Sequence, residues 1–321
     1  MKLMSVPETA EKIKSMEIRG AGRIARAAAE ALRDHALSLE TGSLPAFTAA
    51  MEQAAGTLIA TRPTAVSLPN AVHIVMAGLD KATEAGEAQA GLVRRADGFI
   101  RSSRHAVENI AQFGARHIRD GDTILTHCNS EVALGCIIEA HRSGKDIEVF
   151  ATEVRPRNQG HITIRALNDA GVKTNFIVDS AVRSFINDVD LVIVGADAVT
   201  VNGAVVNKIG TSMVAHTAKE ARVNMIVAAE TYKFAPRTVI GELIDIEERL
   251  PDEVLPAEMA KTLPHVTVRN PAFDVTPAEY IDLIVTEAGA IPPQMAYVII
   301  REYLGWDISE FQKSLELNHN L

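Results

Sequence analysis

The sequence predicts an α/β protein, with a helical N-terminal part over residues 1–115 and a Rossmann-like parallel-sheet part over residues 116–321. Two observations predict this fold class. Up to about residue 115, Ala-rich stretches such as ARAAAEALRDHALSLE place apolar residues three or four positions apart, as amphipathic helices do. From Gly121 onward, short β-branched runs alternate with helical segments, which is typical of right-handed crossover units in a parallel sheet.

Five strands are predicted in the second part, in the order DTILTH, IEVFAT, KTNFIV, DLVIVGAD and NMIVAA. Helices beginning near residues 130, 161, 181 and 212 separate them. The segment 265–293 predicts one more strand, a turn, and a helix opened by Thr276 and Pro277 and closed by Gly289. No flexible linker joins the two parts, so we expect them to pack tightly, with ligands at the carboxyl ends of the strands.

Length and charge limit the classes of function. A chain of 321 residues with 47% hydrophobic content can bury a core for one large or two moderate domains. We take the domains as a helical one over 1–115 and a Rossmann-like catalytic one over 116–321. The formal net charge of -9 argues against a nucleic-acid surface, but it leaves room for a local basic pocket that binds an anionic small molecule.

Cysteine usage and the apolar runs predict the compartment. Cys128 and Cys136 are the two cysteines, eight residues apart on one strand and the helix after it, so a disulfide framework is not expected. The N-terminal MKLMSVPETAEKIKSM lacks the apolar core of a signal peptide, and no run approaches the roughly 18 apolar residues of a membrane span. We therefore expect a cytoplasmic protein without membrane contact.

Cys128 is the first candidate for chemistry, because it stands where a strand runs into a helix whose N-cap is Asn129 or Ser130. Helix amides beside a thiol favour the thiolate, which can act as a base or nucleophile. The alternative interpretation is a small buried core residue. For Cys136, inside an apolar helix, core packing is the expected role.

Asp197 is the second candidate, at the end of the strand DLVIVGAD and therefore at the same edge of the sheet as Cys128. Partial burial among apolar neighbours can raise the pKa of such a carboxyl until it donates a proton near neutrality. The alternative interpretation is that Asp197 caps the turn TVNGAV.

Several segments offer groups for an anion. Asn207 and Lys208 precede a helix whose expected N-cap is Thr211 or Ser212, and Lys233 follows the strand NMIVAA. A solvated surface lysine is the alternative for each. Basic residues also follow strands or lie in Gly- or Pro-containing loops, which favours an anion pocket. These residues are Arg19, Arg62, Arg155 and Arg157.

The spacing of Gly20, Gly22 and Ala25 matches a GxGxxA pattern, but the polar helical stretch EKIKSMEI precedes it instead of a buried strand. We therefore reject dinucleotide binding. The glycine-rich backbone beside Arg19 can cradle a phosphate, or can be a hinge between two helices. The sequence contains no P-loop, GxSxG, HExxH or zinc-type Cys/His cluster, so no metal and no cofactor is expected.

Six segments together carry a family resemblance that runs almost end to end: RGAGRIAR, RPTAVSLPNAV, THCNSEVALG, EVRPRNQGH, GADAVTVNGAVVNKIGT and TPAEYIDLIVTEAGAIPP. With these, the chain resembles the archaeal ribose 1,5-bisphosphate isomerases. They share a superfamily with the methylthioribose-1-phosphate isomerases and the regulatory subunits of translation initiation factor 2B. THCNSE and EVRPRNQGH are the segments that resemble the bisphosphate isomerases in particular.

The resemblance implies that Cys128 accepts and Asp197 donates a proton as ribose 1,5-bisphosphate becomes ribulose 1,5-bisphosphate in AMP degradation. It implies no metal or cofactor and a homo-oligomer, a dimer or a trimer of dimers. The alternatives are a methylthioribose-1-phosphate isomerase and a non-catalytic initiation factor 2B-like regulatory subunit. The implied substrate contacts are Arg19, Gly20, Ala21, Gly22, Arg62, Ser130, Glu131, Val132, Asn207, Lys208 and Lys233.

Overall fold

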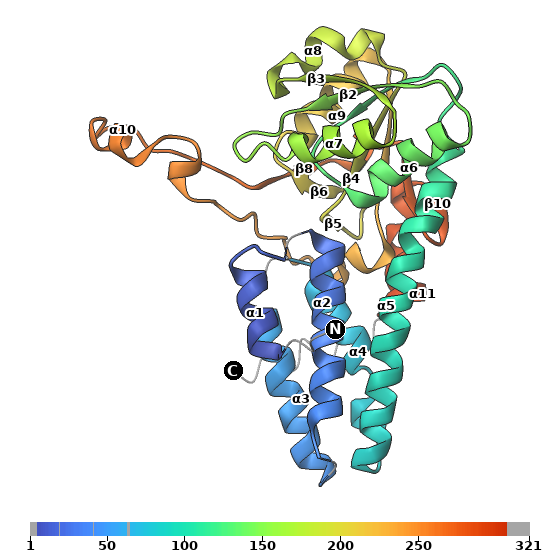
Figure 1. Ribbon diagram of the computed structural model, residues 1–321, viewed down its shortest axis with the longest axis vertical. Coiled ribbons are helices and arrows are strands. Elements are labelled where there is room, and N and C mark those ends of the chain that lie inside the picture. Colours follow the sequence, from blue (N-terminus) through green and yellow to red (C-terminus); the bar gives the residue numbers. More distant parts are fainter. Residues whose placement is uncertain (1–4, 19, 41, 63–64, 307–321) are drawn as a thin grey trace.

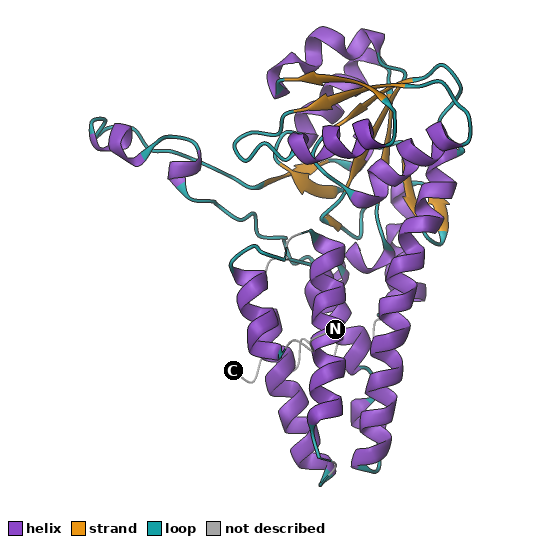
Figure 2. Cartoon of the chain, viewed as in Figure 1, coloured by secondary structure: helices purple, strands orange, loops and turns teal. Residues whose placement is uncertain are grey.

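The fold is described by a computed structural model covering residues 5–18, 20–40, 42–62 and 65–306. A helical part and a sheet part stand end to end, with helices gathered in one and strands in the other (Figure 1, Figure 2). The regular elements described up to residue 115 are all helical, as predicted. They are α1 (Val6–Lys14), α2 (Ala21–Ser38), α3 (Leu44–Ile59), α4 (Ser67–Met76), the 3₁₀ turn Leu79–Lys81 and α5 (Ala85–Ala115).

Local sequence explains where these helices begin. Ser5 precedes α1 and Ser43 precedes α3, and each side-chain hydroxyl accepts from a backbone N–H in the first turn. A proline inside the first turn of both helices suits a position whose N–H has no helical partner. The apolar faces of α1, α2 and α3 meet in a core that includes Ile24, Leu32 and Met51.

Helix α5 is 31 residues long and runs from the helical part up to the sheet part (Figure 1), where it packs against α6 (Glu131–Arg142). Two glycines permit this close approach. A Cβ at Gly114 would overlap the Cys136 side chain, and one at Gly135 would lie 3.2 Å from the Ala111 Cβ. Cys136 is fully buried at this contact, so its predicted core role is confirmed.

The main sheet has seven strands in the order β10-β9-β7-β4-β1-β2-β3. Each pair of neighbours is parallel except β10 with β9, which is antiparallel. The five predicted strands are all present, so the predicted fold class is confirmed. They are β1 (Thr123–Thr126), β2 (Glu148–Thr152), β3 (Lys173–Ile177), β4 (Leu191–Gly195) and β7 (Asn224–Ala228).

Helices cover both faces of this sheet. On one face, Leu125, Val192 and Val227 pack in the same core as α9 (Thr211–Ala221) and the N-terminal helices. On the other face, Ile124 and Ile193 pack with α6 and α7 (Gly160–Asp169). The first of these cores contains residues of both parts of the molecule, so the helical part packs directly against the sheet part as predicted. The short helix α8 (Val182–Phe185) follows β3.

The C-terminal segment differs from the prediction. No helix spans 276–289; the chain instead forms β9 (Leu283–Thr286) and β10 (Gly289–Ile291), followed by α11 (Ala296–Leu304). Ile284 and Val285 point to opposite faces and both are fully buried beside β7, which is what a short apolar run does in a parallel sheet. The predicted helix is therefore wrong, and Gly289, with a φ of 122°, belongs to a hairpin turn.

The segment does contain one further strand, β8 (Phe273–Thr276), but this strand occupies the place predicted for the turn and the start of the helix. It lies in a second, three-stranded antiparallel sheet of order β5-β6-β8. Its other strands are β5 (Ala198–Val199) and β6 (Val205–Lys208). The strands β5 and β6 of this sheet lead from the end of β4 to the start of α9. They place Asp197 and Lys208 close to each other at the carboxyl edge of the main sheet.

Residues 236–272, which we call the arm, leave the body and return to it at β8 (Figure 1). The arm carries the short helix α10 (Ala257–Lys261) at its far end, and several of its apolar side chains are exposed. These include Leu243, Leu250, Met259 and Val266. In the described part of the chain, no helix is both long enough and apolar enough to cross a membrane.

Candidate active site

A cavity of about 430 Å³ lies between the start of α2 in the helical part and the carboxyl edge of the main sheet. It brings together every described residue that the family resemblance implies for catalysis or substrate binding. Arg19 falls outside the described residues. The predicted residues that line the cavity are Gly20, Ala21, Gly22, Arg62, Cys128, Ser130, Glu131, Val132, Arg157, Asp197, Asn207, Lys208 and Lys233.

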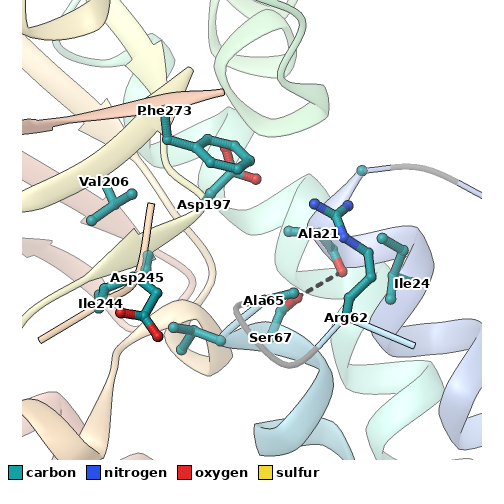
Figure 3. A pocket seen from close by; sticks show the side chains of 13 residues that line it. Ala21, Ile24, Arg62, Ala65, Ser67, Asp197, Val206, Ile244, Asp245 and Phe273 are labelled. Atoms are coloured by element: carbon teal, nitrogen blue, oxygen red, sulfur yellow. Dashed lines mark hydrogen bonds between the residues drawn. The ribbon is translucent and has the colours of Figure 1, made fainter. Parts of the chain in front are cut away.

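A smaller recess of about 50 Å³ adjoins this cavity and shares Arg62 and Asp197 with it. Figure 3 shows Asp197 beside Phe273 on the sheet side, facing Arg62 and Ala21 on the helical side. The Ser67 hydroxyl donates to the Ala21 carbonyl at 3.1 Å, which ties the start of α2 to the start of α4. The acid candidate therefore lies at the junction of the two parts of the molecule.

Cys128 lies in the turn between β1 and α6. Ser130 is the N-cap of α6, and its hydroxyl accepts from the Ala133 N–H at 3.3 Å, which confirms one of the two predicted caps. Cys128 is half-buried and borders the cavity, so it is not a residue enclosed in the core. Its φ of 70° puts it in the left-handed region, which non-glycine residues seldom occupy.

The protonation state predicted for Cys128 is wrong in direction. Burial raises the pKa of the thiol to about 11, opposed mainly by the positive charge of Lys208 and reinforced by Asp197. Cys128 precedes the N-cap by two residues, so it lies outside the first turn where the helix amides act most strongly. Desolvation therefore outweighs the helix, and the resting group is a thiol.

Asp197 follows the fully buried strand β4, and its backbone N–H donates to the Val206 carbonyl at 2.9 Å. Burial raises the pKa of its carboxyl, as predicted, against the lowering effect of Lys233 and Lys208. The turn that Asp197 might have capped is closed by Thr200 instead, whose N–H and hydroxyl both donate to the Ala204 carbonyl. The carboxyl is thus left to face the cavity.

The expected anion site at the start of α9 is occupied by the protein itself. Asp274 of β8 accepts from the backbone N–H of Gly210 at 2.7 Å and of Ser212 at 3.1 Å. Gly210 is the N-cap, so the predicted caps Thr211 and Ser212 are both wrong. Glycine is required here because the φ is 102° and an added Cβ would lie 2.9 Å from the His127 ring. Asp274 thereby fills the site predicted for a substrate oxygen.

The lysines keep their predicted place. Lys208 ends β6 and its Nζ lies 4.7 Å from the centre of the Phe273 ring, where a cation is attracted to the ring face. Lys233 is buried, and its Nζ lies 2.7 Å from an Oε of Glu230. Both line the cavity, so the alternative of a solvated surface lysine is excluded by their position.

Sequence reasoning missed Glu230, which is 2% exposed and lines the cavity. The Tyr232 hydroxyl donates to Glu230 at 3.0 Å, Ser103 of α5 bonds Tyr232 at 3.0 Å, and Arg26 of α2 donates to Ser103 at 3.2 Å. A Cβ at Gly22 would lie 2.9 Å from the Tyr232 oxygen. Glu230 follows β7 at the same sheet edge as Cys128 and Asp197, so the strand-end rule that found those two could have found it.

Arginines of the cavity are paired with glutamates of the arm. Arg62 donates to Glu247 at 2.9 Å and Arg157 to Glu253 at 2.6 Å. Arg249, also missed by sequence reasoning, donates to Glu247 at 2.8 Å. Arg155, the remaining predicted arginine, does not line the cavity. Within the residues described here, no group of three His, Cys, Asp or Glu side chains is placed to hold a metal ion.

The fold and the cavity define a Rossmann-like α/β protein with a thiol and a carboxyl at the carboxyl edge of its sheet. The chain belongs to the Initiation factor 2 subunit family, whose model matches residues 17–293. The resemblance drawn from its motifs is therefore confirmed.

Individual relatives are more specific. The chain is 56% identical to a ribose 1,5-bisphosphate isomerase of Methanocaldococcus jannaschii, covering 94% of this chain and 96% of the relative. It is 54% identical to a protein of the same name from Archaeoglobus fulgidus, over 98% of both chains. A methylthioribose-1-phosphate isomerase of Dehalococcoides mccartyi is 38% identical, over 88% of both chains.

Among solved structures, a translation initiation factor eIF-2B from Pyrococcus horikoshii OT3 superposes with a TM-score of 0.77 at 31% identity, covering 90% of this chain and 97% of that one. The family thus contains members named as enzymes and members named as initiation factors. The site chemistry has to separate these two kinds of protein.

Proposed function

We propose that this protein is an aldose-ketose isomerase that converts ribose 1,5-bisphosphate to ribulose 1,5-bisphosphate in the degradation of AMP. The observation that carries the proposal is the convergence of a thiol, a carboxyl of raised pKa and several cations in one cavity. The relatives that share half or more of their residues with this chain over nearly their full length carry the matching name.

The first step assigns the acid role to Asp197. A phosphate on C1 locks the sugar ring, so the ring opens only when its oxygen is protonated and the bond from C1 to that oxygen breaks. Burial raises the pKa of Asp197, which favours the protonated carboxyl that this step requires. Asp197 leaves this step as a carboxylate.

The second step assigns the base role to Cys128. The resting group is a thiol, so this step uses the fraction of Cys128 that has lost its proton to solvent. That thiolate removes the proton from C2, giving an enol phosphate with a C1 to C2 double bond. The C2 hydroxyl then gives its proton to the Asp197 carboxylate, C2 becomes the ketone, and C1 receives the proton held by Cys128. One proton has moved from C2 to C1 and one from the C2 hydroxyl to the ring oxygen, so both side chains return to their starting states.

The remaining cavity residues supply positive charge and N–H donors for two phosphates. Lys208, Lys233 and Arg62 enter from the sheet part and the helical part. Backbone amides at 20–22 and 130–132 add donors at the starts of α2 and α6, where anions are favoured. We assign Arg19 to the same role from the resemblance.

A methylthioribose-1-phosphate isomerase would use the same acid and base on a sugar with one phosphate. Cations on both sides of the cavity favour a substrate with two phosphates. An initiation factor 2B-like subunit would have no use for a thiol and a carboxyl facing one cavity.

The deciding experiment is a turnover assay with both sugar phosphates side by side. Equal turnover of the two would refute the bisphosphate assignment, and turnover of neither would favour the non-catalytic initiation factor 2B-like subunit.

We further propose a cytoplasmic homo-oligomer, a dimer or a trimer of dimers, with domains at 1–115 and 116–321. The exposed apolar side chains of the arm support assembly, because burying large apolar side chains against a second copy of the chain is favourable. Light scattering checks the proposal, and a mass of 34.6 kDa at micromolar concentration would refute it.

A further inference from the structure

The backbone of Cys128 requires a restraint. Its φ of 70° places the Cβ in an unfavourable position against its own backbone, and such residues persist only where their surroundings hold them. The direction of the thiol depends on this conformation, since the Cβ would turn away if φ returned to the usual range. The group that holds the turn therefore controls where the thiol points.

Thr163 of α7 contacts the turn that contains Cys128. It is 1% exposed, and its hydroxyl donates to the Cys128 carbonyl at 2.9 Å, with the Asn129 Oδ1 at 3.4 Å. A threonine inside a helix usually donates to the carbonyl four residues earlier in its own helix. Thr217 of α9 does this, donating to Met213 at 2.8 Å. Thr163 instead reaches a turn 35 residues away in sequence.

Helix α7 is itself placed firmly. A Cβ on Gly160, its first residue, would overlap the Thr152 carbonyl oxygen and lie 2.9 Å from the Glu153 Cα. The start of α7 therefore lies directly on the end of β2. The Thr163 hydroxyl, three residues further along, is a restraint anchored to the sheet.

The residue before Cys128 is held from the other side. The His127 ring is buried, with Nδ1 2.7 Å from the Thr152 Oγ1 and Nε2 2.8 Å from the Ile209 carbonyl oxygen. A carbonyl only accepts, so Nε2 carries the proton and Nδ1 accepts from the Thr152 hydroxyl. With His127 fixed to the sheet, the Thr163 bond holds the next peptide unit, whose carbonyl is that of Cys128.

We propose that Thr163 is a positioning residue for Cys128: its hydrogen bond to the Cys128 carbonyl holds the left-handed turn and directs the thiol into the cavity. The kinetic consequence rests on the proposed function. The geometry of the thiol does not, so the two can be tested apart.

The test uses the full-length protein and three variants. Thr163→Val removes the hydroxyl at nearly constant volume, Thr163→Ser keeps it, and Thr217→Val removes a buried threonine hydroxyl that bonds within its own helix. We expect Thr163→Val to lower kcat by about tenfold to a hundredfold, with KM changed by less than about threefold, because misplacement of a reacting group affects the chemical step. Thr163→Ser and Thr217→Val should stay within about twofold of the parent.

The second readout is alkylation of Cys128 by iodoacetamide at one fixed pH without substrate, located by peptide mapping. Cys136, fully buried between α5 and α6, is the internal reference. The Cys128 rate should fall in Thr163→Val by about threefold or more and stay near the parent rate in Thr163→Ser, because only the first lets the thiol turn from the cavity. If Thr163→Val does not fold, Thr163→Ala replaces it with the same expectation.

An unchanged alkylation rate in the folded variant without the hydroxyl would overturn the proposal, whatever the kinetics. Equal losses in Thr163→Ser and Thr163→Val would also overturn it, because the cause would then be packing and not the hydrogen bond. A parent protein that does not turn over the bisphosphate would refute the proposed function. The alkylation comparison would still decide the role of Thr163.

Discussion

The two reactive groups of the cavity are held in different ways. Around Cys128, the restraints are neutral hydrogen bonds, from Thr163 to the carbonyl and from the His127 ring to its neighbours. Around Asp197, the neighbours are charged: Lys233 and Glu230 form a buried ion pair beside it. The hydrogen bonds around Cys128 therefore fix the direction of its thiol, whereas the charges around Asp197 act on the protonation of its carboxyl.

The difference also bears on pH. Burial raises the pKa of both groups, to about 11 for Cys128, so the resting Cys128 is a thiol and the protonated form of the Asp197 carboxyl is favoured. Turnover needs Asp197 protonated and Cys128 deprotonated. The reactive fraction consequently grows as pH rises toward the Cys128 pKa of about 11, until Asp197 loses its proton. A charge that shifts either pKa should move one limb of the pH profile and leave the other.

The largest expected effect is loss of either group. Cys128→Ser replaces the thiol with a hydroxyl that hardly ever ionises, and Asp197→Asn removes the transferable proton, so each should lower kcat by about 10²-fold or more. Substrate binding, measured by calorimetry, should persist. A folded variant that keeps more than about a tenth of parent turnover would remove that residue from the mechanism.

The next largest effect is expected at the contact between β4, which precedes Asp197, and the start of α6, which follows Cys128. Gly195 of β4 has no room for a Cβ, which would overlap the Ser130 side chain at the start of α6. Gly195→Ala should lower the free energy of unfolding by about 1–3 kcal/mol, because the N-cap of α6 must move. Gly98→Ala inside α5, where nothing lies within 4 Å of the new Cβ, is the control and should be neutral or stabilising by up to about 1 kcal/mol. Denaturant unfolding measures both, and equal losses would show that Ser130 does not limit this position.

A smaller effect is expected from the charge next to the base. Lys208 lowers the pKa of Cys128, so Lys208→Met should raise it further above about 11 and slow iodoacetamide labelling of Cys128 near neutrality by about tenfold. The assay contains no substrate, so lost phosphate binding cannot contribute. Lys173→Met, on the exposed edge strand β3, is the matched control. A labelling rate equal to that of the control would mean that Lys208 does not stabilise the thiolate.

The smallest effect is a shift on the acid side. The negative charge of Glu230 raises the pKa of Asp197, and its removal also frees Lys233 to lower that pKa. Asp197 must be protonated and Cys128, with a pKa of about 11, must be deprotonated, so the rise of turnover with pH levels off at the Asp197 pKa. Glu230→Gln should therefore move that levelling-off to lower pH by about one unit or less. The readout is the pH profile of kcat/KM beside Glu258→Gln on the arm, and a shift to higher pH would contradict the assignment.

Much of the site followed from the sequence because strand ends and helix starts are local signals. Cys128 and Asp197 each follow a short β-branched run, and parallel strands bring such positions to one edge. Asn207 and Lys208 were found because they precede a helix, and the antiparallel strand β6 carries them. The failures were non-local. Part of the segment 276–289, predicted as a helix, forms the strand β9 because it pairs with the edge of β7. The start of α9 is capped by Asp274, which lies 64 residues further along the chain than Gly210.

The sequence by itself determined the fold class, five of the seven strands of the main sheet and many of the residues that meet in the cavity, because hydrophobic periodicity and strand ends can be read from neighbouring residues. Only the tertiary structure decided the raised pKa of Cys128, the burial of Glu230, the pairing of arm glutamates with cavity arginines, and the bond from Thr163. Those properties depend on desolvation and on contacts between segments far apart in the chain. No local pattern of residues records which distant group will exclude water or supply a partner.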